Sequence, residues 1–430
     1  MIYDFVLITK IIFIGFISYL FKITDYNITI INILKQLSDL NITFAKIFQW
    51  SFIDEKNRNI YITNEIYEYV YNYTNNTPYT NSDIDYEKIL QTNILANNLG
   101  DKFELTDTIP IGSGTISLVF KGKLNNNPVA IKLLRKNIDE QLKKGIDLLV
   151  IIGYILSKIP YINLLMFDKI IEKNKKNFMN QKNFQNEVSN IKLFYNKLKK
   201  NKFVKVPNVY PIYTNNIDRI IIMDYIDGRK IDQLTIEEKQ NFIIPFIKFI
   251  KNSIFSANIL HTDLHQGNIL FIEEKCGDKI IYKVGIIDLG MVVTLGIVDC
   301  NFCYYFIDSI FNNKFMNFIE YLFDDDNYAE IFEKISMEQI IRLRKIFKDE
   351  YELNGLFKII EIKNIISDTY FFLKIIKNNN CEFSHNIHKI LLGLLPIFSV
   401  IVGLGNDSKN NILVQKEFSK MNNNNLLNDI

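Results

Sequence analysis

The sequence lacks the features that mark several common functional classes. Its 430 residues carry a formal net charge of only +2, so no strong overall field points to a nucleic-acid partner. Only four cysteines occur, and the one close pair, Cys300 and Cys303, is spaced C-x-x-C in a run that is predicted to be helical. A zinc site would need further ligands, so the cysteines indicate a reducing compartment and little else.

The N-terminal segment lacks the marks of a cleaved targeting signal. Residues 5–21 are apolar, interrupted by Lys10, and near the minimum length of a helix that spans a membrane. They have neither the basic start and small-residue cleavage site of a signal peptide nor the arginine-rich character of a transit peptide. Two interpretations stay open: a hydrophobic helix packed on the rest of the protein, or a membrane anchor. A second apolar run, 146–167, predicts a buried helical insertion.

The hydrophobic pattern changes its period along the chain. From 23 to 102 the period is helical, whereas 109–134 alternates, is rich in β-branched residues and is broken by glycines and an Asn-rich turn. This predicts a glycine-bearing hairpin followed by a third strand. Helical segments follow to about residue 200, residues 219–225 form another strand, and the remainder is mostly helical except near 267–293. The order predicts an α+β, two-lobed protein-kinase-like fold, with a small β-rich N-lobe, a larger helical C-lobe and an N-terminal helical extension.

The hairpin carries residues that are typical of a nucleotide site. In the Gly112-Ser113-Gly114 turn, the absence of Cβ atoms on the glycines lets backbone N–H groups approach phosphates. Lys132, in the run Val-Ala-Ile-Lys, follows 18 residues after Gly114 and is expected to reach the α- and β-phosphates of ATP. Such a lysine needs a carboxylate to hold it extended, and Glu187, on a predicted amphipathic helix, is the candidate.

The strongest signal is the pair of motifs His-Thr-Asp-Leu-His-Gln-Gly-Asn at 261–268 and Ile-Ile-Asp-Leu-Gly at 286–290. In phosphoryl transfer an aspartate accepts or orients the proton of the nucleophile. An asparagine five residues later binds magnesium, and a second aspartate bridges magnesium to the β- and γ-phosphates. Asp263, Asn268 and Asp288 supply these residue types in order, so they are the predicted catalytic base and metal ligands.

Two features expected of a kinase that acts on peptides are missing from these motifs. Thr262 stands where protein kinases usually carry an arginine that grips a phosphorylated activation loop, and no Ala-Pro-Glu motif follows Gly290. The platform that holds a peptide is therefore not visible, and no peptide substrate is expected. His265 is expected to have a structural, hydrogen-bonding role.

The sequence resembles the UbiB (aarF-domain) family of atypical protein-kinase-like proteins, from about residue 41 to residue 405. A weaker match is the run Thr-Phe-Ala-Lys-Ile-Phe-Gln-Trp, which is similar to the K-x-G-Q signature of that family and keeps Lys46 and Gln49, with Phe48 at the glycine position. The specific matches are IPIGSGTISLVFKG, NFQNEVSN, HTDLHQGNILF and IIDLGMVV.

The resemblance implies the contents of the site and a role. ATP and Mg²⁺ are the implied cofactors, and the extension is implied to fold over the lobe interface with Lys46 and Gln49 at the nucleotide. The run that ends in Met-Asp-Tyr resembles the last N-lobe strand and hinge, where Met223 and Tyr225 are expected to contact the nucleotide. The implied role is ATP hydrolysis, or phosphorylation of a small or lipid-like target, in support of quinone (coenzyme Q) biosynthesis or lipid homeostasis at an intracellular membrane.

Two other functional classes stay open from the residues alone. A small-molecule kinase of the aminoglycoside or choline type also uses a His-x-Asp-Leu-His-x-Gly-Asn motif, and a pseudokinase scaffold would bind nucleotide or lipid without turnover. The expected organisation is a hydrophobic N-terminal segment (1–22), a helical extension (23–105), an N-lobe (106–225) with a helical insertion (137–180), a C-lobe (226–410) and a polar tail (411–430).

Overall fold

The structure is a computed structural model in which the chain divides into two compact units. The first unit comprises Met1–Val188 and Val209–Tyr225, and the second comprises Ser189–Asn208 and Ile226–Ile430. The first holds the larger sheet and the second is mainly helical, so the expected α+β class is confirmed. The residues described are 2–46, 48, 63–156, 182–358, 364–405 and 408–420.

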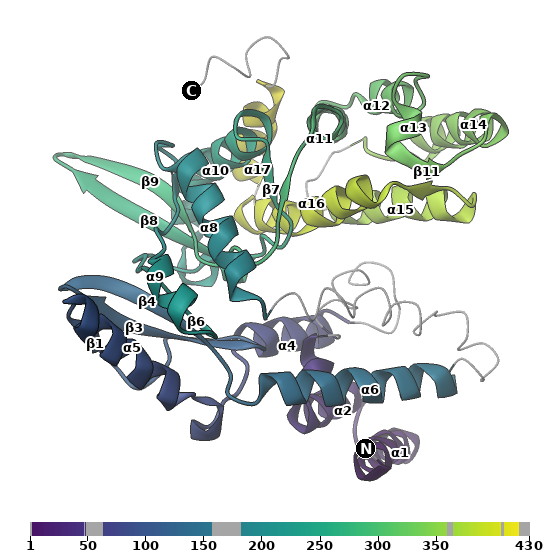
Figure 1. Cartoon of the computed structure of the whole chain (residues 1–430). Helices are drawn as coiled ribbons and strands as arrows, with labels where there is room; N and C mark the ends of the chain where they lie inside the picture. The colour runs from purple at the N-terminus through teal and green to yellow at the C-terminus, as the bar shows by residue number, and fades with distance from the viewer. Residues whose placement is uncertain are drawn as a thin grey trace. The chain divides into compact units, whose positions relative to one another are not determined.

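A five-stranded antiparallel sheet organises the first unit (Figure 1). The strand order is β1-β3-β4-β6, and β2 pairs with β3. Asn125 and Asn126 close the β3–β4 hairpin with φ angles of 51° and 67°, a left-handed conformation that asparagine tolerates better than most residues. The strands are β1 (Phe103–Leu105), β2 (Gly112–Ser113), β3 (Ser117–Leu124), β4 (Asn127–Leu134) and β6 (Ile220–Asp224).

One face of this sheet is covered by α5 (Tyr86–Leu99) and α9 (Pro211–Asn216). Ala96 of α5, Tyr213 of α9 and the strand residues Phe120 and Ile131 share one hydrophobic core. The sequence places residues up to 105 in the helical extension, but α5 and β1 belong to the sheet layer. A helical period shows which face of α5 is apolar, but it does not show which part of the fold that face covers. The sequence therefore could not assign α5 to the sheet layer.

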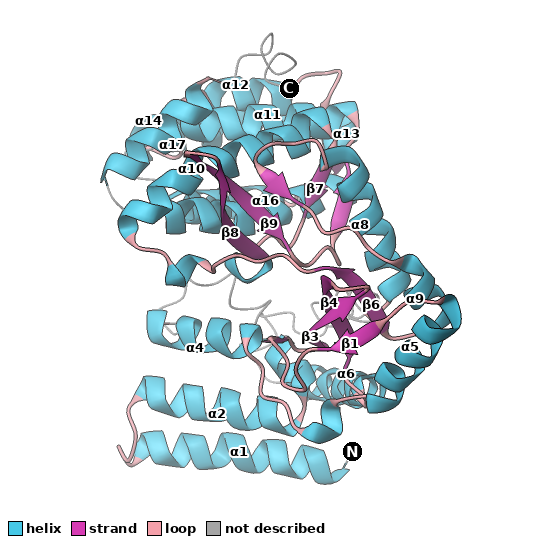
Figure 2. Ribbon diagram, turned by 90° about the vertical axis from the view of Figure 1, so that its left-hand side faces the viewer, coloured by secondary structure: helices cyan, strands magenta, loops and turns pink. Residues whose placement is uncertain are grey.

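The helical extension proper is built from α1 (Ile2–Leu20), α2 (Tyr26–Leu40) and α4 (Asn64–Asn75), which lie side by side in Figure 2. A Cβ on Gly15 of α1 would lie 2.5 Å from Ile33 of α2, so glycine allows the two helices to approach closely. The predicted insertion begins as α6 (Ile138–Leu156), and its Leu148 packs in the same cluster as Ile8. The rest of the insertion, 157–181, lies outside the described residues.

The second unit contains a helical layer with three small sheets. β8 (Ile269–Cys276) and β9 (Lys279–Ile286) form an antiparallel hairpin that β5 (Val204–Lys205) extends, and β7 (Ile259–His261) pairs with β10 (Val292–Thr294). β11 (Phe332–Lys334) pairs with β12 (Glu382–Phe383). The helices are the end of α8 (Phe184–Leu198), α10 (Ile236–Lys251), α11 (Ile297–Phe311), α12 (Phe315–Leu322), α13 (Tyr328–Ile331), α14 (Met337–Asn354), α15 (Ile365–Asn378), α16 (His385–Leu404) and α17 (Ser408–Ser419).

The C-terminal part of the chain differs from the expected polar tail. From Ser408 to Ser419 it forms α17, and Phe418 is buried with its ring stacked 3.9 Å from that of Phe311. The reason is that a few apolar residues at helical spacing are enough to dock a short helix. Among the described residues no group of three or more His, Cys, Asp or Glu could hold a metal. The C-x-x-C pair lies on α11 in the helical layer, where burial raises the pKa of the Cys303 thiol.

Candidate active site

The sheet of the first unit places the predicted nucleotide residues on one face. Residues that pair directly across strands point to the same side, and the register aligns Gly112 with Val119 and Val119 with Lys132. Ala130 pairs with Met223 two residues along, so the side chain of Met223 lies on the Lys132 face. The opposite face carries the hydrophobic core under α5. The glycine turn, Lys132 and Met223 therefore share one face of the sheet.

Lys132 and Glu187 form a buried ion pair. Lys132 Nζ lies 2.6 Å from Glu187 Oε1, and the two side chains are only 6% and 4% exposed. The ring of Phe184, on the first turn of α8, lies 5.8 Å from the same ammonium. Desolvating two charges costs several kcal/mol per ion, and apolar residues of similar volume often stabilise a core as well or better. Stability alone therefore does not account for this pair.

The glycine turn is closed by its own backbone. The Gly114 N–H donates to Ser117 O at 2.9 Å, and neither Gly112 nor Gly114 has a positive φ angle. A Cβ on Gly114 would meet nothing closer than 3.5 Å, whereas a Cβ on Gly122 would lie 2.5 Å from Ile131. Packing within the unit thus requires glycine at 122, whereas a Cβ at 112 or 114 would make only ordinary contacts. The reason for glycine at 112 and 114 is therefore not packing, and it fits a ligand that approaches the backbone closely.

The remaining predicted residues of the first unit have separate surroundings. Met223 is buried in β6, and the half-buried ring of Tyr225 lies 4.2 Å from Lys121 Nζ. Lys46 is buried at the end of the helical segment 42–46, and Gln49 lies outside the described residues. Phe48, at the family's glycine position, stacks on Phe44 and packs against two apolar clusters of the extension, a role that the sequence does not predict.

In the second unit the β8–β9 hairpin holds the predicted metal ligands together. Asn268 directly precedes β8 and Asp288 follows β9, and Ile287 N donates to Asn268 O at 3.1 Å. Asn268 Nδ2 donates to Asp263 O at 2.9 Å, which ties the predicted base to the same site. All three side chains are half-buried. Asp263, Asn268 and Asp288 are thus brought together locally, as their spacing predicts.

His261 organises this site, a role that the sequence does not predict. Its Nδ1 accepts the Asp263 N–H at 3.1 Å, so the proton lies on Nε2, which donates to Asp288 O at 2.5 Å. The ring is buried, and burial lowers its pKa, which favours this neutral form. The one feature of the sequence that could have indicated this role is the position of His261, two residues before the predicted base Asp263.

Other contacts fix the two motifs from outside. His265 Nδ1 accepts the Gly267 N–H at 3.1 Å, so its expected structural role is confirmed. A Cβ on Gly393 of α16 would lie 2.8 Å from Thr262, a residue that is buried against this helix. Asn190, in the middle of α8, donates to Leu289 O at 2.9 Å. The position where peptide kinases carry an arginine is therefore filled by packing.

The two sets of residues lie in different units. Lys132, Glu187, the glycine turn and Met223 belong to the first, and the 261–268 and 286–290 motifs belong to the second. Each set is assembled within its own unit. Their convergence on a single nucleotide stays a prediction.

Comparisons with known proteins agree with the motifs. A model of the ABC1 atypical kinase-like domain matches residues 75–322, more than half of the chain. AarF domain-containing protein kinase 1 of Gallus gallus is 25% identical over 208 residues, 47% of this chain and 39% of the relative. A "Probable protein kinase UbiB" of Shewanella frigidimarina is 26% identical over 249 residues, 56% of this chain and 44% of the relative. The chain thus matches less than half the length of each.

Two solved structures were also matched. The Rv3197–erythromycin complex from Mycobacterium tuberculosis matches 69% of this chain and 74% of its own, with 13% identity and a TM-score of 0.42. The Rio2 kinase–ADP/Mg²⁺–phosphoaspartate complex from Chaetomium thermophilum matches 77% and 96%, with 13% identity and a TM-score of 0.32. On the match of the domain model, this chain belongs to the ABC1 atypical kinase-like family, and its matched relatives carry the UbiB and AarF-domain names that the motifs predict.

Proposed function

We propose that this chain is an atypical kinase or ATPase of the UbiB type that binds ATP with Mg²⁺. The observation that carries the proposal is the buried Lys132–Glu187 ion pair on the same sheet face as the open glycine turn. Gly112 and Lys132 lie on strands that are two strand spacings apart, with Val119 between them, so they are separated by about 10 Å. The phosphates of a nucleotide can bridge this distance. In this role Lys132 contacts the α- and β-phosphates, and Glu187 holds its ammonium in place.

The residues of the second unit fit a magnesium ion by their donor chemistry. Mg²⁺ prefers oxygen ligands, and Asp288 supplies a carboxylate. The amide nitrogen of Asn268 is committed to Asp263 O, so the amide oxygen is the atom that remains to ligate a cation. When bound, the ion neutralises charge on the β- and γ-phosphates. The Asp263 carboxylate orients the attacking hydroxyl or water and accepts its proton, while His261 keeps the backbones of Asp263 and Asp288 in register.

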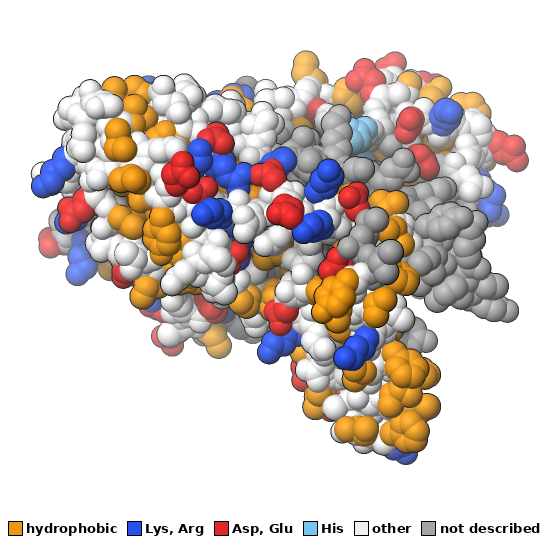
Figure 3. Space-filling view, turned by 60° about the horizontal axis from the view of Figure 1, so that its bottom comes forward, with side chains coloured by type: hydrophobic (Ala, Val, Ile, Leu, Met, Phe, Trp, Pro, Cys, Tyr) orange, Lys and Arg blue, Asp and Glu red, His pale blue; other side chains and the backbone are white. Residues whose placement is uncertain are grey.

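The proposed acceptor is a small or lipid-like molecule at an intracellular membrane, such as a quinone precursor, rather than a peptide. Two described helices are long and apolar enough to cross a membrane: α16, which is mostly buried, and α1, of which only a small part is fully buried. Figure 3 shows apolar side chains gathered over α1 at the lower end of the view, and they include Phe13 and Phe16. Such a surface is costly in water and suits a lipid interface.

Nucleotide binding with and without magnesium tests the proposal. Wild-type protein is expected to bind ADP and ATP, with tighter binding of ATP when Mg²⁺ is present. The Asp288→Asn variant is expected to lose the magnesium-dependent part and ATP turnover, measured with liposomes and quinone-precursor phenols. Turnover of soluble amino alcohols alone would instead favour a small-molecule kinase, binding without any turnover would favour a scaffold, and absence of nucleotide binding would end the proposal.

A further inference from the structure

We propose that Arg135 is a positioning residue that holds the glycine turn to the loop Thr77–Asp83, so that this loop is part of the nucleotide site. The inference rests on the proposed function for its nucleotide. Thr77–Asp83 follows α4 and includes the 3₁₀ turn η1 (Asn81–Asp83). It therefore joins the helical extension to the β-sheet layer of the same unit.

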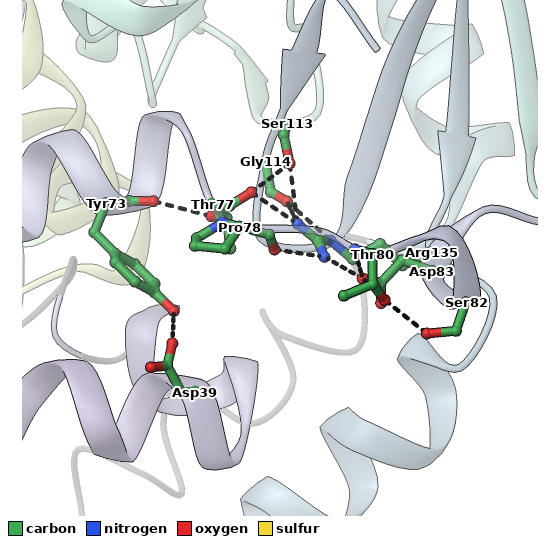
Figure 4. Close-up of polar contacts among 10 residues, drawn as sticks. All are labelled: Asp39, Tyr73, Thr77, Pro78, Thr80, Ser82, Asp83, Ser113, Gly114 and Arg135. Atoms are coloured by element: carbon green, nitrogen blue, oxygen red, sulfur yellow. Dashed lines mark hydrogen bonds and ion pairs between the residues drawn. The ribbon is translucent and has the colours of Figure 1, made fainter. Parts of the chain in front are cut away.

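The guanidinium of Arg135 lies at the centre of a ring of acceptors (Figure 4). On the side of the turn, Nε and Nη2 donate to Gly114 O at 3.1 and 3.0 Å, and Nη2 donates to Ser113 Oγ at 3.1 Å. On the side of the loop, Nη2 donates to Thr77 O at 3.2 Å and Nη1 to Pro78 O at 3.1 Å. Nη1 also lies 3.2 Å from Asp83 Oδ2. One side chain thus bridges the turn and the loop.

The turn and the loop also bond directly to each other. Thr77 N donates to Ser113 O at 2.9 Å, and Ser113 Oγ donates to Thr77 O at 2.5 Å. The hydroxyl of Ser113 is therefore engaged by the loop. A phosphate at this turn would be bound by backbone N–H groups, and the serine side chain would fix the shape of the turn.

The position of Arg135 in the sequence couples it to the lysine of the site. It stands three residues after Lys132, just beyond the end of β4, and its own N–H donates to Ile116 O at 3.0 Å in the tip of the turn. Backbone and side chain of Arg135 thus hold opposite ends of the segment Gly114–Ile116. A shift of the loop would be transmitted to the turn through contacts of fixed geometry.

Only a guanidinium fits this arrangement. Arg135 is 2% exposed, and burial lowers its pKa, an effect that the pairing with Asp83 opposes. Its planar fork makes bonds to four acceptors on two segments together with one carboxylate, whereas a lysine ammonium has three donors at a single point. Burying the charge of a guanidinium costs free energy, and most of the partners of Arg135 are neutral carbonyls that do not offset this cost as an ion pair would. We therefore assign Arg135 the role of fixing the backbone that surrounds it.

The test is the affinity of Arg135→Lys for adenosine, ADP and ATP, measured by calorimetry. A misplaced turn should weaken ADP and ATP binding about tenfold and leave adenosine within about twofold, since only the phosphates meet the turn. The matched control is Arg229→Lys, at a half-buried arginine of the second unit with two carboxylate partners, which should change none of the three affinities. Equal loss for all three ligands, or no loss, would overturn the positioning role.

Hydrogen exchange of the unliganded protein separates this inference from the proposed function. Arg135→Lys should speed amide exchange at Gly114 and Thr77 and leave exchange in β8 and β9 unchanged. If wild-type protein binds no nucleotide, the proposed function fails, while the exchange result still shows whether Arg135 holds the turn. If Arg135→Lys does not fold, Ser113→Ala removes two of the side-chain bonds at lower cost and should give the same pattern, weaker in size. Unchanged exchange in both variants would contradict the proposal.

Discussion

Individual glycines in the N-terminal unit have distinct roles that the structure separates. At Gly122 a Cβ would lie 2.7 Å from the carbonyl oxygen of Glu104 and closer still to Ile131, so the fold itself requires glycine. At Gly114 the nearest atom would be 3.5 Å away, which is an ordinary contact. The sequence motif alone does not distinguish these two cases, because the packing around each glycine comes from strands that are distant in the sequence.

Two alanine variants test this difference. Gly114→Ala should leave the melting temperature within about 2 °C of wild type and weaken ADP binding severalfold, because only a ligand competes for that space. Gly122→Ala should destabilise the protein by about 1–3 kcal/mol through overpacking. Thermal unfolding and ADP titration measure both effects. A Gly114→Ala protein with unchanged ADP affinity would remove the argument that a ligand approaches this turn.

The buried His261 predicts a pH dependence of stability. Burial lowers the pKa of His261 in the folded protein, so the unfolded state binds a proton more readily. Stability from this group is present above the unfolded pKa of about 6.5 and is lost as the pH falls below it, by at most about 1.4 kcal/mol per pH unit. His261→Asn should be less stable at neutral pH and show a smaller loss between about pH 7.5 and 5.5.

Urea unfolding at several pH values measures these slopes. The control is His385→Asn, which replaces an exposed histidine of the same unit and should keep the wild-type slope. Identical slopes for wild type and His261→Asn would show that the buried ring does not titrate as its surroundings indicate.

At the scale of elements, the strands that carry the site could be predicted and their neighbours could not. Alternation and turn residues predict β3, β4 and β6, and the break in the helical pattern near 267–293 covers β8 and β9. Helix α17 and the joining of α5 to the sheet could not be predicted, because each depends on apolar surface supplied by other parts of the chain. The role of Arg135 is hidden for the same reason, since its partners lie 21 and 58 residues away.

Helix α1 makes a prediction at this scale. The sequence left packing and membrane anchoring open. The structure shows a packed side that includes the buried Ile8, while another group of apolar side chains, Phe13 and Phe16 among them, is exposed. Replacing Phe13 and Phe16, which are 62% and 58% exposed, by serine should reduce liposome binding about tenfold or more without changing the melting temperature.

The matched variant for α1 is Ile8→Ala, at a position that is 3% exposed. It should lower stability by about 2–5 kcal/mol, because it leaves a cavity between α1 and α2. Flotation with liposomes and thermal unfolding of the three proteins give the comparison. Unchanged flotation of the Phe13→Ser/Phe16→Ser protein would mean that α1 packs on another surface than lipid.

At the scale of the whole molecule, the sequence predicts which residues act and the structure shows how each group is assembled. The need of Lys132 for a carboxylate predicts its pairing with Glu187, and spacing predicts that Asp263, Asn268 and Asp288 lie together; both local arrangements are observed. Spacing could not predict the backbone supports, His261 and Arg135, whose hydrogen bonds go to main-chain atoms of other segments. Such bonds leave little trace in residue type, since every residue offers a carbonyl.

The central claim is that the two groups act on one nucleotide, and a double-mutant cycle on ATP turnover tests it most directly. Lys132→Met, Asp288→Asn and the double variant should all reduce turnover to the same background, because residues that act as a unit are not additive. Independent, multiplicative losses for the two substitutions, or turnover that one of them leaves unchanged, would contradict the account.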